Sequence, residues 1–174
     1  HVIRPAMSAF EALARLREGN RRFTSNVRSL DALLSTARRA DIEPQTPCAI
    51  VLGCSDSRAP AEIVFDQGLG DLFVIRVAGN IVAPSQVGSV EFAAERFGTR
   101  LVVVMGHTGC GAILATLEHM ENPGETSSRN LRSIVDRVRP SIEPLMKTEL
   151  ARDRAALLRE ATRANVRVAA DHLR

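Results

Sequence analysis

Residues 49–58 read AIVLGCSDSR and residues 101–111 read LVVVMGHTGCG, and the architecture of the chain follows from these two stretches. Each begins with an apolar run of strand type and then passes through a turn of small residues toward a helix. The runs are apolar along their whole length and do not alternate with polar residues. Such runs are typical of parallel strands that are buried on both faces of a sheet.

A third apolar run at 72–77 lies between these two, and helical patterns separate the three. Ser8 and Glu11 form a capping-box pattern that opens the first helix. The other helical patterns cover 29–39, a short stretch from Pro60 to Phe65, 85–97, 109–120, and 127 almost to the end with interruptions near Pro140 and Pro144. This order predicts an α/β fold. We expect a central, mostly parallel sheet of about four strands, flanked by helices and preceded by an N-terminal helical arm.

The length of 174 residues, with 45% hydrophobic and 25% charged residues, predicts one globular domain. Within this single domain (1–174) we distinguish a helical arm at 1–40, a core at 45–120 and C-terminal helices at 125–174.

The composition argues against several functions. The chain has no Trp or Tyr and a net charge of only +3, so a nucleic-acid surface is poorly supplied with stacking and basic residues. We expect neither a membrane-spanning segment nor a signal peptide. The glycines after the strands do not follow the G-x-G-x-x-G pattern of dinucleotide-binding folds. Three cysteines without a disulfide framework favour a reducing, cytoplasmic setting.

The two turns carry candidate metal ligands. Cys54 follows the first apolar run, and His107 and Cys110 follow the last. Because functional groups gather at the carboxyl ends of parallel strands, we expect the two thiols and the imidazole to converge. Thiolate and imidazole favour zinc, and three protein ligands leave one position open, as in catalytic zinc sites. The alternative is that both cysteines are ordinary buried thiols, which is how we interpret Cys48.

Asp56 and Arg58 lie two and four residues after Cys54 in the same turn. A carboxylate in this place can be a fourth ligand, an anchor for the ligands or a proton acceptor, and the arginine can hold it by a bidentate pair. The alternative is a surface ion pair of little energetic consequence.

Together, CSDSR at 54–58, RVAGN at 76–80 and HTGCG at 107–111 resemble the bacterial β-class carbonic anhydrases. The resemblance extends from Ser8 to about Met120 in order and spacing. It implies one Zn²⁺ per chain, bound by Cys54, His107 and Cys110, with water or hydroxide at the fourth position.

The resemblance also implies an activity and further site residues. Zinc-bound hydroxide would attack carbon dioxide, with bicarbonate and a proton as products. Asp56 and Arg58 would form the family's dyad, which controls the fourth zinc position; in a closed form Asp56 itself becomes the fourth ligand. The remaining implied residues, which would contact carbon dioxide or bicarbonate, are Gln45, Phe73 and Ala78.

The chain also departs from the family's pattern. Some members have a second bicarbonate site built around a tryptophan and a tyrosine, whereas this chain has Val51 at the corresponding strand position. We therefore expect an open, non-inhibited zinc site, although Arg76 is present. Family members usually continue into a further edge strand, but this sequence stops at Arg174 in a helical pattern, so we expect that strand to be missing.

Two alternatives to carbon dioxide hydration stay open at this point. The same site could hydrolyse carbon disulfide or carbonyl sulfide, since access to the pocket would decide the substrate. A zinc-stabilised binding module would instead keep Asp56 on the metal at every pH. We also expect a homodimer or homotetramer, because the N-terminal helix carries an apolar stripe that a partner subunit could cover.

Overall fold

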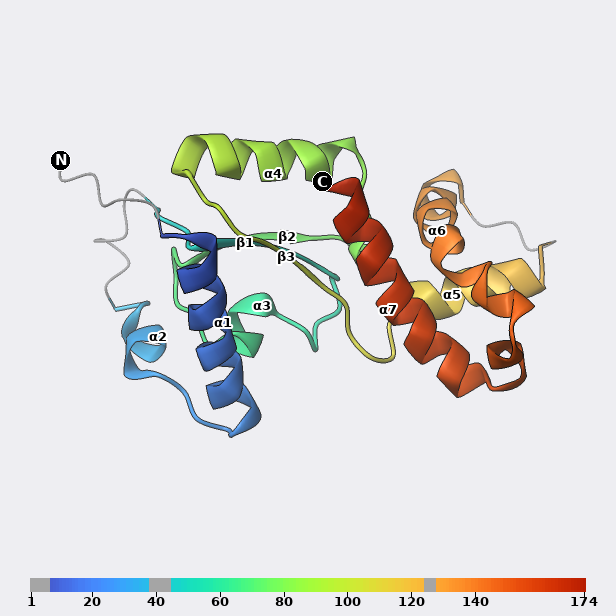
Figure 1. The fold of residues 1–174 in the computed structure, drawn as a ribbon, viewed down its shortest axis with the longest axis horizontal. Coiled ribbons are helices and arrows are strands. Elements are labelled where there is room, and N and C mark those ends of the chain that lie inside the picture. The colour runs from blue at the N-terminus through green and yellow to red at the C-terminus, as the bar shows by residue number, and fades with distance from the viewer. Residues whose placement is uncertain (1–6, 38–44, 124–127) are drawn as a thin grey trace. The chain divides into compact units, whose positions relative to one another are not determined.

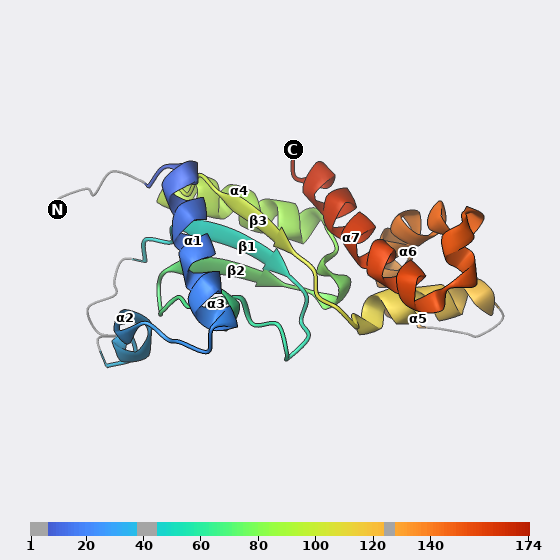
Figure 2. The ribbon, with the colours of Figure 1, turned by 60° about the horizontal axis from the view of Figure 1, so that its bottom comes forward.

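The computed structural model describes residues 7–37, 45–123 and 128–174. It contains a parallel sheet of three strands in the order β2-β1-β3 (Figure 2). The strands are β1 (Ala49–Gly53), β2 (Leu72–Arg76) and β3 (Val102–Met105). The middle strand β1 is buried at every residue, as its unbroken apolar run predicts. The α/β fold class is confirmed, with three strands among the described residues instead of about four.

The chain divides into two compact units. The sheet unit contains the described residues of 1–52, 57–75 and 85–103; the helical unit contains 53–56, 76–84 and the described residues of 104–174. The strands thus belong mostly to the sheet unit, while the turns at their carboxyl ends belong to the helical unit. The division of the sequence into an arm, a core and C-terminal helices stays a prediction.

In the sheet unit, helices cover both faces of the sheet. Helix α4 (Pro84–Phe97) lies over one face, and α1 (Ala9–Thr24) and α3 (Ala61–Val64) lie over the other (Figure 1). The predicted capping box opens α1: the Glu11 amide donates to Ser8 Oγ at 3.3 Å, and the Ser8 amide donates to the Glu11 carboxylate at 2.9 Å. Helix α2 (Leu30–Leu34), capped by Ser29, begins where the helix over 29–39 was predicted but is shorter, and residues 38–39 lie outside the described residues.

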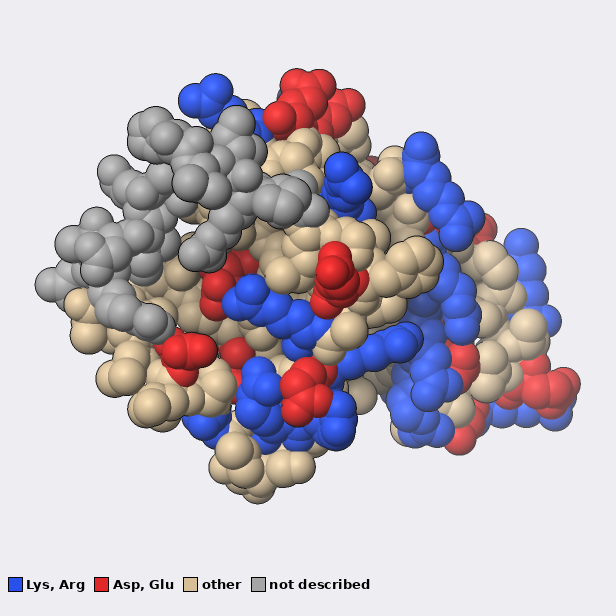
Figure 3. Space-filling view, turned by 60° about the vertical axis from the view of Figure 1, so that its left-hand side comes forward, with Lys and Arg blue, Asp and Glu red and all other residues tan. Residues whose placement is uncertain are grey.

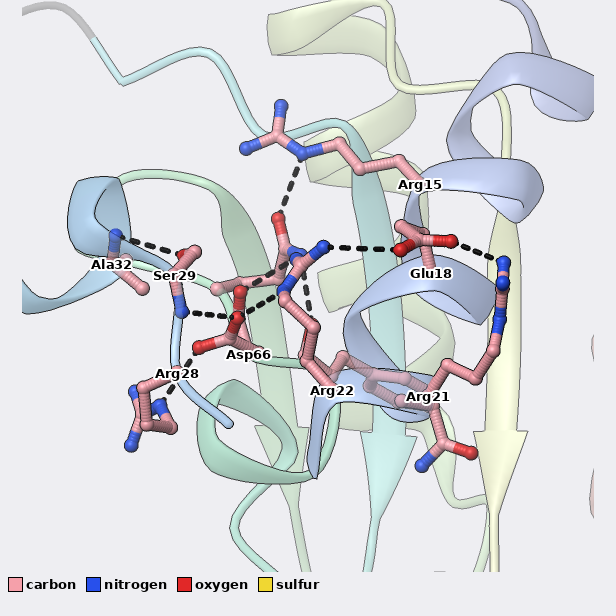
Figure 4. A network of polar contacts seen from close by, with 12 residues as sticks. Arg15, Glu18, Arg21, Arg22, Arg28, Ser29, Ala32 and Asp66 are labelled. Carbon is pink, nitrogen blue, oxygen red and sulfur yellow. Dashed lines mark hydrogen bonds and ion pairs between the residues drawn. The ribbon is translucent and has the colours of Figure 1, made fainter. Parts of the chain in front are cut away.

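A buried carboxylate ties the N-terminal segments of this unit together. Asp66 has a fully buried side chain that accepts hydrogen bonds from Arg22 Nε at 2.5 Å, Arg28 Nε at 2.7 Å and the Ser29 amide at 2.9 Å (Figure 4). Burial alone would raise the pKa of Asp66, but these donors outweigh it and lower the pKa to about 2. The network therefore fixes the end of α1 and the start of α2 to the turn after α3.

The helical unit consists of three packed helices and short 3₁₀ turns. Its elements are η2 (Ala78–Asn80), α5 (Gly111–Glu121), α6 (Arg129–Ile142), η3 (Leu145–Lys147), η4 (Glu149–Arg152) and α7 (Arg154–His172). The three α-helices pack against one another around a core that includes Ile113, Leu117 and Val138. The helix expected to break near Pro140 continues through it to Ile142; the proline removes one backbone donor, and the helix ends two residues later.

Charged side chains of both signs are interspersed on the surface that Figure 3 shows. Several form ion pairs at helical spacing, such as Arg152 with Glu149 and Arg163 with Glu160. Pairs of this kind between exposed side chains contribute little to stability. In the described part of the chain, none of the helices has the length and apolarity needed to cross a membrane.

Candidate metal centre

Three potential metal ligands converge in the helical unit. Cys54 follows β1, His107 follows β3, and Cys110 is the N-cap of α5. Their ligand atoms, two Sγ and one imidazole nitrogen, all lie within 4.8 Å of one another. Both cysteines are buried and His107 is half-buried. The two turns that the sequence singled out therefore meet, as expected for parallel strands that end at one edge of a sheet.

The orientation of His107 leaves one ring nitrogen available for a metal. Its Nδ1 lies 3.1 Å from the carbonyl oxygen of Thr108. Because a carbonyl can only accept, Nδ1 carries the proton in this contact and Nε2 carries the lone pair. Nε2 is buried and has no hydrogen-bond partner among the residues that the structure describes. A buried nitrogen without a partner is costly unless something ligates it.

The two thiols differ in their electrostatic environment. Burial alone would raise the pKa of Cys54, but the neighbouring His107 ring and the amides of Asp56 and Gly79 outweigh it and lower the pKa below its usual value. Burial raises the pKa of Cys110, and the charge of Cys54 adds to this effect. A cation between the two sulfurs would stabilise both thiolates.

These donors fit a zinc ion. The ligand atoms of a tetrahedral zinc site are roughly 3.5 Å from one another. The three ligand atoms observed here, which lie within 4.8 Å of one another, therefore need to move only a short way toward a shared ion. Two sulfurs and one nitrogen match the ligand types that zinc prefers over magnesium and calcium. Three protein ligands leave a fourth position open.

His107 and Cys110 line one side of a cavity of about 780 Å³. Its other wall is α7, which contributes residues such as Leu158, Thr162 and Val166. The lining is mainly apolar close to the two ligands, with the arginines of α7 at positions 159, 163 and 167 also on the wall.

Hydrogen bonds hold the turn that contains Cys54. Arg76, the last residue of β2, donates from Nε to the Cys54 carbonyl at 2.9 Å and from a terminal nitrogen to the Asp56 carbonyl at 2.6 Å. The amide of Gly79 donates to Cys54 Sγ at 3.3 Å, and Asn165 on α7 donates to the Gly79 carbonyl at 2.7 Å. Asp56 is half-buried beside His107, and Arg58 is exposed.

The other predicted site residues lie in both units. Ala78 is half-buried in η2, next to Gly79. Phe73 is on β2 in the sheet unit, where its ring packs against Phe92 and Phe97 of α4 with centroids 6.1 and 6.0 Å away. Gln45 is exposed in the sheet unit, ahead of β1.

Sequence reasoning missed two residues that hold the Cys54 turn. The sequence indicated Arg76 as part of the RVAGN motif and in connection with a second bicarbonate site, but no local pattern shows that it would donate to the carbonyls of this turn. Asn165 could have been found from the sequence, because it is the one polar residue in a buried stripe of α7 whose members are four residues apart. The other members of the stripe are Leu157, Ala161 and Ala169. A polar residue in such a stripe requires a hydrogen-bond partner.

Comparison with known proteins identifies the family. The family model described as carbonic anhydrase matches residues 49–174. The chain belongs to the carbonic anhydrase family. The carbonic anhydrase of Mycolicibacterium smegmatis is 43% identical over 149 residues, which are 85% of this chain and 71% of that protein. Carbonic anhydrase 2 of Mycobacterium tuberculosis is 41% identical over 139 residues, 79% of this chain but only 66% of that protein.

Solved structures share the fold of the chain. The β-carbonic anhydrase CcaA superposes with a TM-score of 0.68 over 92% of this chain and 73% of that chain, at 23% identity. This likeness concerns the fold. The predicted resemblance to β-class carbonic anhydrases, a family of lyases, is confirmed.

Proposed function

We propose that the chain catalyses the zinc-dependent, reversible hydration of carbon dioxide to bicarbonate and a proton, with Cys54, His107 and Cys110 as the zinc ligands. The observation that carries the proposal is the convergence of these three ligand atoms within 4.8 Å in a chain of the carbonic anhydrase family. Bound zinc supplies a Lewis acid that lowers the pKa of a coordinated water from about 16 toward 7.

The protein's own residues orient the ligands and handle the proton. The contact of Nδ1 with the Thr108 carbonyl leaves Nε2 as the nitrogen of His107 that would bind the metal. The Asp56 carboxylate lies beside Nε2 and can accept a proton or hydrogen bond at the open position; with Arg58 it forms the proposed dyad. In a closed form, the same carboxylate would occupy that position.

Substrate contacts are proposed for Gln45, Phe73 and Ala78. Of these, Ala78 has the most direct support, because it lies in the same turn as Gly79, whose amide contacts Cys54. Homodimer or homotetramer formation and a cytoplasmic location also remain predictions.

Metal analysis and a carbon dioxide hydration assay, each repeated on Cys54→Ser, test the proposal. We expect about one zinc per chain in the wild type, and loss of most zinc and activity in the variant, because a serine hydroxyl is a poor zinc ligand. Cys48→Ser is the matched control: Cys48 is also a buried cysteine but lies just before β1 in the sheet unit, so zinc should stay bound. A Cys54→Ser protein with full zinc and activity would refute the ligand assignment.

A further inference from the structure

Asn165 is a buried polar residue on a helix face that is otherwise apolar. It is 3% exposed, and its neighbours on the buried stripe of α7 are Leu157, Ala161 and Ala169. A carboxamide in such a place costs free energy unless its polar groups are hydrogen-bonded. Both the oxygen and the nitrogen of this carboxamide have a hydrogen-bond partner. The packing of apolar side chains does not explain these two contacts.

The two hydrogen bonds of Asn165 fix the orientation of its carboxamide group. Ser141 Oγ on α6 donates to Asn165 Oδ1 at 3.2 Å, and Asn165 Nδ2 donates to the Gly79 carbonyl at 2.7 Å. Because the Gly79 carbonyl can only accept, the amide group must face it. Ser141 is itself 2% exposed, so the pair excludes water from this contact.

Gly79 links Asn165 to a zinc ligand. Its carbonyl accepts from Asn165, and its amide donates to Cys54 Sγ at 3.3 Å. The backbone has φ +71°, and a Cβ here would lie 3.0 Å from Ala112 Cβ and 3.2 Å from a Val138 methyl. A side chain at this position would be crowded by these two residues, and the backbone of Gly79 connects Asn165 to the Cys54 sulfur through one hydrogen bond at its carbonyl and one at its amide.

We propose that Asn165 is a positioning residue for Cys54, which acts through the backbone of Gly79. The proposal rests on the function proposed above, in which Cys54 ligates zinc. An N–H donor on a thiolate fixes the direction of the sulfur and draws electron density from it, which changes both metal affinity and the strength of the metal–sulfur bond. Helix α7 would thus control the metal centre without contributing a ligand.

The test compares two substitutions of Asn165 with a packing control. Asn165→Leu keeps the approximate volume and removes both hydrogen bonds. Asn165→Asp keeps the shape and the acceptor for Ser141 but cannot donate to Gly79 when ionised. Leu157→Ala removes a buried side chain from the same stripe and leaves the Asn165 contacts in place. Circular dichroism and thermal unfolding establish which variants fold.

Two measurements separate positioning from general stability. Competition with a chelator gives the zinc dissociation constant, which we expect to rise about 10- to 100-fold in the Asn165 variants. In the cobalt(II)-loaded protein, the thiolate-to-metal charge-transfer band should move to longer wavelength, because a sulfur that has lost its N–H donor gives up electrons more easily. Leu157→Ala should unfold at a lower temperature, with an unchanged band and an affinity within about threefold of wild type.

Asn165 variants that unfold earlier, as Leu157→Ala does, but keep the wild-type band and zinc affinity would overturn the proposal. A measurement on the wild type applies even if neither variant folds. In protein loaded with cadmium-113, the Gly79 amide proton should show scalar coupling to the metal through the Cys54 sulfur. The absence of this coupling would also overturn the proposal.

The outcomes also distinguish this proposal from the proposed function. A wild-type chain that binds no zinc and hydrates no carbon dioxide contradicts the function itself. A wild-type chain that does both, with Asn165 variants that match it in affinity and spectrum, contradicts only the role of Asn165.

Discussion

His107 Nε2 lies 3.9 Å from Asp56 Oδ2, and both residues belong to the helical unit. The nitrogen that would ligate zinc therefore has a carboxylate next to it, on the turn that also carries Cys54. This carboxylate is not among the three atoms that converge, and under the proposed function it would act on the open ligand position. This arrangement allows a separation of metal binding from proton handling.

The first prediction concerns that separation. Asp56→Asn should retain zinc, because the three proposed ligands are unchanged, but lose about 10²-fold or more in kcat/KM, since the amide cannot accept a proton. Metal analysis and stopped-flow hydration measure the two effects. Asp171→Asn, at the exposed end of α7, should leave both unchanged. Asp56→Asn that loses zinc in step with activity would instead indicate a carboxylate ligand and favour the zinc-stabilised binding module.

A second prediction concerns the pH dependence of activity. Two thiolates neutralise more of the metal's charge than three imidazoles would, so the Lewis acidity of the site is weaker. We expect kcat/KM for carbon dioxide to keep rising into the alkaline range in wild-type protein. A profile of kcat/KM that is already flat at mildly acidic pH would contradict the ligand set.

The role of Arg76 provides a third prediction. Arg76→Met keeps the length of the side chain but removes the donors to the Cys54 and Asp56 carbonyls. The turn should become less ordered, and zinc should pass to a chelator about 10-fold faster. Arg96→Met, in the last turn of α4, is the matched control and should release zinc at the wild-type rate. Equal rates in all three proteins would show that Arg76 does not stabilise the ligand turn.

A fourth prediction concerns stability. Asp66→Asn should lower the free energy of unfolding by about 2–3 kcal/mol, because Arg22 and Arg28 lose the buried charge that they share. Glu18→Gln removes an exposed carboxylate that pairs with Arg21 on α1 and should cost less than about 1 kcal/mol. Urea unfolding at neutral pH compares the two variants. Similar losses of unfolding free energy in both would contradict a stabilising role of the Asp66 network.

The Asp66 carboxylate should also make the free energy of unfolding depend on pH in the acidic range. The pKa of Asp66 is lowered from its ordinary value of 3.8 to about 2 in the folded chain, so folding favours the ionised form. This contribution is complete above about pH 4 and is lost as the pH falls through about 2. Unfolding curves of wild type and Asp66→Asn should therefore differ most above pH 4 and approach each other toward pH 2.

A fifth prediction contrasts two glycines. Gly79→Ala should destabilise the chain by about 1–3 kcal/mol, because of its φ of +71° and the close contacts its Cβ would make with Ala112 and Val138. Gly88, within α4, has open space at its Cβ position, so Gly88→Ala should stabilise by about 0.5–1 kcal/mol. Thermal unfolding measures the signs, and equal effects of the two substitutions would contradict the strain at Gly79.

Much of the fold could be predicted from the sequence, because the patterns that indicate it are local. The apolar runs before Cys54 and His107, and the capping box at Ser8, each depend on a few consecutive residues. The convergence of Cys54, His107 and Cys110 could also be predicted, since parallel strands place their carboxyl ends at one edge of a sheet. The length of α2 and the continuation of α6 through Pro140 were not predicted, because propensity alone sets helix ends poorly.

Contacts between distant segments could not be predicted in this way, because they depend on how helices pack and not on spacing along the chain. Only the tertiary structure brings Asn165 to the carbonyl of Gly79, 86 residues away, and Arg76 to the Cys54 turn. The same holds for Asp66, whose acidic side chain is buried because two arginines from the segment before it close over it. The sequence determined which residue types could bind a metal, since that is a property of their donor atoms. Packing decided which backbone groups hold those donors in place, because a hydrogen bond needs a distance and a direction that no linear pattern contains.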